Sequence, residues 1–146
     1  MRTEHINKLV KTAESCVETG LLCKAASYFH RVLDLSRPGE FTVELALLRL
    51  SQVYREQCRF DDAITFMHRA ISVRPKEPRY QLALAELLLL NGDSAQALIV
   101  AYETISYPMT HIEALALITR INQEIGSFEM VNCPIDPRLS RPALLQ

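Results

Sequence analysis

The sequence predicts an all-α fold, a solenoid of about three and a half helix-turn-helix repeats. The first observation behind this prediction is a repeat, in which an apolar residue followed by a small one recurs at steps of 34 residues. It occurs at Leu50–Ser51, Leu84–Ala85 and Ile118–Thr119. The second observation is the position of the helix-breaking residues, because the prolines and most glycines stand between apolar segments of helical spacing.

The period divides a repeat domain over residues 1–127 into four units. They cover about residues 6–39, 44–77, 78–111 and 112–127, and a proline-rich C-terminal tail covers 128–146. Apolar residues at helical spacing predict the helices 4–18, 22–35, 41–57, 61–73, 78–90, 94–106 and 111–125. Asp61, and either Asp93 or Ser94, suit helix starts as N-caps or first-turn acids, where they satisfy free amides and favour the positive helix end.

Glycines are expected at the turn inside a unit, at Gly20, Gly92 and Gly126. In the second unit Cys58 stands at this place. The step from Gly20 to Cys58 is 38 residues, so about four extra residues lie near Ser36–Glu40.

The bulk composition excludes several classes of partner. The chain has 146 residues, is 49% hydrophobic and carries a formal net charge of −1, so we expect no nucleic-acid partner. The N-terminus is charged throughout, and the longest apolar run, Leu82–Leu90, is too short for a bilayer and contains Glu86. We therefore expect a cytoplasmic protein without membrane insertion.

No pattern of catalytic, cofactor-binding or metal-binding residues is present. The four histidines fall in different units without ligand spacing, and the sequence contains no phosphate loop or nucleophile elbow. Cys16, Cys23 and Cys58 are expected as small buried side chains, and Cys133 as the exposed thiol. We expect a protein that is not an enzyme and has no cofactor or metal.

The second unit resembles the tetratricopeptide repeat. It has Leu47, Leu50, Ser51 and Tyr54, followed by Ala63, Met67, Ala70 and Pro75, in the order of the family signature. The third unit keeps Leu84, Ala85 and Ala97 but has Gln81 and Leu88 where the family prefers aromatic residues. The resemblance covers about residues 6–125 and implies a right-handed α-solenoid.

The fourth unit departs from the family pattern. Its first helix carries Ile112 and Leu115, but Pro134, Pro137 and Pro142 argue against a full second helix. Terminal repeats need a polar outer face or a capping helix. Either the tail folds back over this helix, which is the alternative we favour, or another chain covers it.

The resemblance also implies a partner-binding site, because the first helices of such units line a concave groove where peptides bind. Carried over by register, the groove includes Val10, Glu14, Leu45, Leu48, Gln52, Arg55, Arg79, Leu82, Glu86, Leu89, Arg120 and Gln123, together with Asn7 and Ala116. The leucines are either exposed anchors for an apolar peptide or side chains packed between helices.

Heat-shock co-chaperones of this family hold an acidic C-terminal carboxylate with a set of Lys, Asn and Arg residues. Here the matching positions are Val10, Glu14, Arg49, Arg79 and Ala83, or Leu48, Gln52, Ala83, Glu113 and Leu117 one repeat later. The set is absent in both registers, so a heat-shock-protein tail is not the expected partner.

Two functions remain. The first is a non-catalytic module that binds a peptide segment of a partner with apolar anchors, as an assembly adaptor or a small dedicated chaperone. In size and build the chain looks similar to the bacterial type III secretion chaperones, and residues 76–98 resemble their middle repeat. The second is a structural scaffold that forms a homo-oligomer by stacking through its C-terminal repeat.

Overall fold

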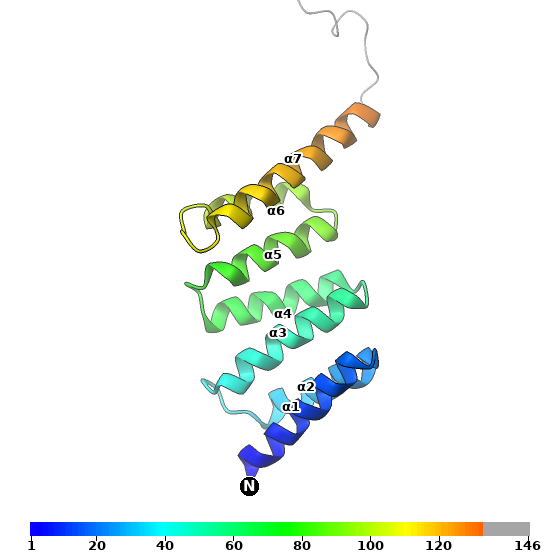
Figure 1. The fold of residues 1–146 in the computed structure, drawn as a ribbon, viewed down its shortest axis with the longest axis vertical. Helices are drawn as coiled ribbons and strands as arrows, with labels where there is room; N and C mark the ends of the chain where they lie inside the picture. The colour runs from blue at the N-terminus through cyan, green and yellow to red at the C-terminus, as the bar shows by residue number, and fades with distance from the viewer. Residues whose placement is uncertain (133–146) are drawn as a thin grey trace, which may run out of the picture.

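The computed structural model describes residues 1–132, which form seven α-helices and no strand. The helices are α1 (Arg2–Glu18), α2 (Leu22–Leu35), α3 (Phe41–Glu56), α4 (Phe60–Val73), α5 (Pro78–Leu90), α6 (Ser94–Thr104) and α7 (His111–Asn132). The pairs α1/α2, α3/α4 and α5/α6 follow one another along the longest axis, with α7 at the far end (Figure 1). The predicted all-α solenoid is confirmed.

Small residues let the two helices of each unit approach closely. Ala85 on α5 and Ala97 on α6 are completely buried, and the matching pair on α3 and α4 is Ser51 and Ala63. The Ser51 hydroxyl donates a hydrogen bond to the Ala63 carbonyl over 2.9 Å, so the buried hydroxyl is satisfied. Larger side chains fill the space between units in one core cluster, which includes Phe29, Leu50 and Ile121.

The turns inside the first three units share one geometry. The amide of Leu21 donates to the carbonyl of Cys16, and at the matching places Arg59 donates to Tyr54 and Asp93 to Leu88, each over 2.8–2.9 Å. This is the Schellman end of a helix, which needs a residue with positive φ. Gly20 (φ 79°) and Gly92 (φ 87°) supply it as predicted, and Cys58 (φ 59°) does so in the second unit.

The extra residues of the first two units lengthen α3. This helix has 16 residues, against 13 in α5, and the connection before it runs over 36–40, against 74–77 before α5. Arg2 secures this junction, donating to the Leu35 carbonyl over 3.0 Å and pairing with Glu40 over 2.6 Å. The hydrogen bond from Arg2 holds the pKa of the Glu40 carboxyl below its ordinary value.

A buried carboxylate on α3 connects this helix to α5 and to Arg74, the residue that follows α4. Glu44 on α3 is only 5% exposed, accepts a hydrogen bond from the Tyr80 hydroxyl on α5 and pairs with Arg74 over 3.1 Å. Burial, and then the hydrogen bond to Glu44, raises the pKa of Tyr80 to about 12.

The fourth unit differs from the prediction. Gly126 was expected at a turn, but α7 continues through it without positive φ and ends at Asn132. The predicted boundary between residues 127 and 128 therefore falls inside a helix. The physical reason is that one glycine weakens a helix by only about 1 kcal/mol, which the helical neighbours on both sides outweigh.

Two of the cysteine predictions were wrong. Cys23 and Cys58 are exposed, because both lie at or beside the turn inside a unit, where no further helix covers them. Cys16 is partly buried, and Cys133 lies outside the described residues.

Candidate peptide-binding face

The site predicted for a partner lies on the sides of α1, α3, α5 and α7 that the second helices do not cover. We call this surface the first-helix face. On α3 it is formed by Leu45, Leu48 and Gln52, which occupy one side of the helix at spacings of three and four residues. Leu45 and Leu48 are half-buried and Gln52 is exposed. Leu48 also packs against the core cluster, so only part of this leucine faces outward.

On α5 the structure places the predicted residues differently. Leu82 and Leu89 are buried in the core, so the alternative that these leucines pack between helices applies to them. The reason is position, because α5 packs mainly against α6 and α4 and also touches α7. The outward side of α5 instead follows the exposed Arg79 and Leu90 and the half-buried Ala83 and Glu86, of which Arg79 and Glu86 were predicted.

An ion pair joins the faces of α1 and α3. Glu14 on α1 and Arg49 on α3 approach to 3.3 Å, and Arg49 also donates to the Gln52 side chain over 3.0 Å. Val10 lies one turn before Glu14 and is half-buried. A hollow of about 180 Å³ between the two helices is lined by Glu14, Val17, Glu18 and Arg49.

A second ion pair joins the faces of α3 and α5, where Arg55 and Glu86 approach to 3.8 Å. Both residues belong to the predicted set. Because one pair joins α1 to α3 and another joins α3 to α5, the first-helix face is a continuous surface with paired charges and half-buried leucines. On α7 the remaining predicted residues, Arg120 and Gln123, are exposed, as are Ala116 on the same helix and Asn7 on α1.

The predicted set of groove residues left out three residues of the first-helix face, namely Arg49, Ala83 and Leu90, although Arg49 and Ala83 were considered as positions of a carboxylate-binding set. The signal for the last two was available, because Arg79, Ala83, Glu86 and Leu90 follow at spacings of four, three and four residues along one side of α5. The alignment with the family had instead predicted Leu82 and Leu89, each one residue before Ala83 and Leu90.

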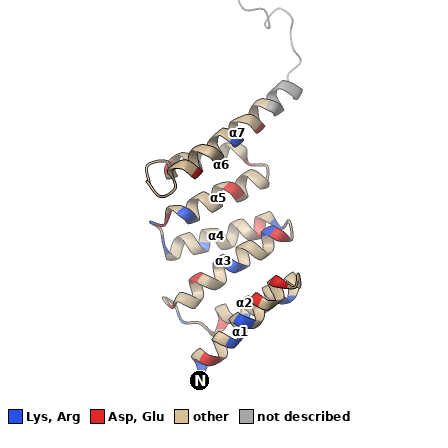
Figure 2. Ribbon diagram, in the orientation of Figure 1, with Lys and Arg blue, Asp and Glu red and all other residues tan. Residues whose placement is uncertain are grey.

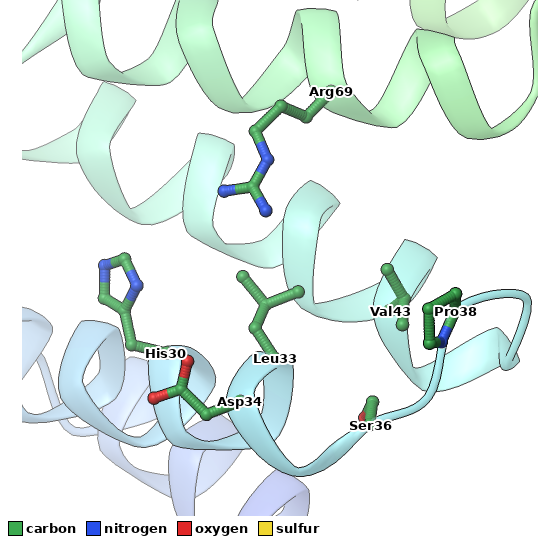
Figure 3. Close-up of a pocket in the computed structure, with 7 residues that line it drawn as sticks. All are labelled: His30, Leu33, Asp34, Ser36, Pro38, Val43 and Arg69. Atoms are coloured by element: carbon green, nitrogen blue, oxygen red, sulfur yellow. The ribbon is translucent and has the colours of Figure 1, made fainter.

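A separate pocket lies on the second helices (Figure 3). It has a volume of about 300 Å³ and is lined by His30, Leu33, Asp34, Ser36, Pro38, Val43 and Arg69. His30 is hydrogen-bonded to the Tyr54 hydroxyl over 2.8 Å, and the Arg69 guanidinium lies 5.3 Å from the centre of the Phe66 ring. The lengthened start of α3 contributes Val43, so the pocket is a consequence of the extra residues near Ser36–Glu40.

Charges of both signs are interspersed along the helices, and they thin out toward α6 and α7 (Figure 2). Among the described residues, no group of three or more His, Cys, Asp or Glu side chains is arranged to hold a metal ion. No helix in this part of the chain is long and apolar enough to cross a membrane.

No protein-family model and no curated protein matches the chain. Solved structures do match. A tetratricopeptide repeat protein from Parabacteroides merdae has a TM-score of 0.75 at 19% identity, over 84% of this chain and 48% of that one. This chain therefore spans about half the length of the Parabacteroides protein.

A second match is SycD, the type III secretion chaperone of Yersinia enterocolitica, in a structure with a peptide of the translocator YopD. Its TM-score is 0.70 at 19% identity, over 83% of this chain and 95% of SycD. At such identities the likeness concerns the fold, and it shows that the chain has the fold of tetratricopeptide repeat proteins.

Proposed function

We propose that this chain is a non-catalytic interaction module that binds a peptide segment of a partner protein on its first-helix face. The observation that carries the proposal is the continuity of that face, in which the pairs Glu14–Arg49 and Arg55–Glu86 connect three successive first helices. Leu45 and Leu48 lie on the middle helix of the three, so apolar anchors of a peptide would meet them at the centre of the surface.

The role proposed is that of an assembly adaptor or a small dedicated chaperone. The likeness to SycD supports it, because that chaperone matches over nearly its whole length and its structure holds a peptide. Of the four arginines on the first-helix face, Arg49, Arg55 and Arg79 are already in ion pairs, which leaves Arg120 alone rather than a set of cations that would hold a carboxylate. The proposed peptide is therefore anchored by apolar side chains rather than by a terminal charge.

The test is affinity capture from the native lysate with wild-type protein and Leu48→Asp. The aspartate introduces a charge at the centre of the face, on a half-buried side chain that also packs against the core cluster. Circular dichroism therefore has to show first that the variant keeps its helicity. We expect one dominant protein in the wild-type sample and at least about a tenfold loss of it in the variant, which corresponds to about 1.4 kcal/mol.

The matched control is Ile99→Asp, which places the same charge at an exposed apolar residue of α6, away from the first-helix face. It should capture as much partner as the wild type. Equal loss in both variants, or equal capture by Leu48→Asp and the wild type, would contradict the assignment of the face.

A further inference from the structure

The beginning of α7 exposes apolar positions that are buried in a complete unit. Leu115 corresponds to Leu47, 68 residues earlier, yet Leu115 is 44% exposed and Leu47 only 2%. Thr119 corresponds in the same way to Ser51, and it is exposed while Ser51 is buried. Ile112 is 80% exposed. The second helix of a unit covers these positions in α3, and no described helix takes its place on α7.

The prolines after α7 do not favour a second helix within residues 133–146. α7 runs past Gly126, where a turn would have to begin, and ends at Asn132. In the 14 residues that remain, Pro134, Pro137 and Pro142 leave no proline-free run longer than four residues. The second helices of the other units have 11 to 14 residues, and the sequence predicts none of that length here.

The other end of the solenoid, at α1, does not suit head-to-tail association of successive copies. The outer side of α1 carries Glu4, Lys8, Lys11 and Thr12, which are all exposed. A head-to-tail contact would place this charged side on the apolar side of α7 and bury its charges. A two-fold contact instead places α7 of one copy on α7 of another, so that each apolar side meets an identical one.

The charges of α7 suit an antiparallel arrangement. Glu113 and Arg120 are seven residues, or two turns, apart on the same flank of the helix. Both are exposed, and neither forms an ion pair within the described chain. In an antiparallel pair centred between residues 116 and 117, Glu113 of each copy lies opposite Arg120 of the other, and the small Ala116 lies near the axis.

We propose that two copies of this chain form a dimer through antiparallel α7 helices, with Ile112, Leu115 and Ala116 in the contact and two Glu113–Arg120 ion pairs beside it. The inference does not rest on the proposed function, because the contact takes only Ala116 and Arg120 from the α7 end of the first-helix face, and the parts of that face on α1, α3 and α5 lie outside it. The proposed assembly is a closed dimer rather than a growing scaffold. In an isologous contact both copies use the same surface, so no such surface remains to bind a third copy.

The first experiment measures mass by sedimentation velocity on the full chain between about 1 and about 200 µM, a range that covers weak dimers. We expect the wild type to change from monomer to dimer within it. Ile112→Glu should raise the midpoint concentration at least about tenfold, because a charge would be buried at the contact. Ile99→Glu, at an apolar residue of α6 that is 55% exposed, should leave the midpoint unchanged.

The second experiment tests the antiparallel register by reversing charges. Glu113→Arg alone and Arg120→Glu alone each place like charges opposite one another and should raise the midpoint several-fold, whereas the double variant should restore it to within about threefold. Circular dichroism checks that every variant keeps its helicity.

A wild type that stays monomeric over the whole range would overturn the proposal. The apolar side of α7 would then be covered by the tail or by a helix of a different protein. A dimer that Ile112→Glu leaves intact would also overturn it. So would a double charge reversal that associates no better than the single variants.

Discussion

At the scale of single residues, Cys58 shows how the fold overrides a residue's own preference. Its φ of 59° lies in the left-handed region, where the side chain of a non-glycine residue crowds the following carbonyl. The positions that correspond to it in the neighbouring units hold Gly20 and Gly92. The same Schellman hydrogen bonds form in all three units. The repeat geometry is therefore maintained although Cys58 adopts an unfavourable backbone conformation.

We therefore predict that Cys58→Gly stabilises the protein by about 1 kcal/mol, the cost of the left-handed conformation less the added freedom of glycine in the unfolded chain. Urea denaturation measures the difference. Cys23→Gly is the control, because Cys23 is an exposed cysteine in the first turn of α2, where glycine relieves no positive φ and should destabilise by about 0.3 kcal/mol. Stabilisation by both variants would point to the thiol rather than to the backbone.

Tyr80 gives a pH dependence that belongs to one side chain. Its ordinary pKa of 10 is raised to about 12 in the folded protein, so the folded state favours the neutral phenol. A raised pKa contributes stability that is fully present below pH 10 and is lost as the pH rises from 10 to about 12.

We expect Tyr80→Phe to lose about 2 kcal/mol near neutral pH, since a hydrogen bond to the charged Glu44 is removed. Between pH 10 and about 12 its stability should then fall less steeply than that of the wild type. Urea titrations at several pH values measure both effects. Parallel pH profiles for the two proteins would contradict a raised pKa of Tyr80 in the folded protein.

At the scale of elements, the helices followed from periodicity because each unit repeats the same local conditions. Predicted and observed bounds agree within two residues at both ends of the first six helices, for example 61–73 against Phe60–Val73. The exception is α7, which was predicted to end at residue 125 and ends at Asn132. No second helix packs against α7 in the described chain, so nothing requires a turn at Gly126.

The close approach of paired helices leads to a prediction about small residues. Ala97→Arg, and likewise Ala63→Arg, should destabilise the protein by at least about 3 kcal/mol, because a long charged side chain would have to fit where no part of the alanine is exposed. Circular dichroism during thermal unfolding measures this loss.

Ala95→Arg is the matched control, because Ala95 lies on the same helix as Ala97 but is exposed. Its stability should remain within about 0.5 kcal/mol of the wild type. Equal destabilisation at both positions would mean that α6 does not tolerate arginine for reasons other than packing.

At the scale of the whole molecule, a solenoid is stabilised by contacts between neighbouring units, so its ends are its weak points. α7 contacts α6 and α5 on one side only, whereas α3 and α5 have helices on both sides. Charged residues are also sparse near α7, and Ile112, Leu115 and Met109 are exposed there.

We expect backbone amides of α7 to exchange hydrogen faster than those of α3 and α5 in dilute protein, because α7 opens without disturbing the other units. Hydrogen exchange with mass spectrometry measures this at low and high protein concentration. Protection of α7 that rises with concentration would agree with the α7 dimer, and equal protection of all first helices in dilute protein would contradict a weak end.

The sequence by itself determined the repeat, the helices and the small residues between them, because these depend on local conformation and on spacing along the chain. It also identified Glu14, Arg55 and Glu86 as surface residues, since charged side chains avoid the core. Only the tertiary structure decided that Leu82 and Leu89 are buried while Leu90 is exposed, because α5 is a central helix whose free side depends on both neighbours. The length of α7 was decided in the same way, by the absence of a partner helix among the described residues rather than by Gly126.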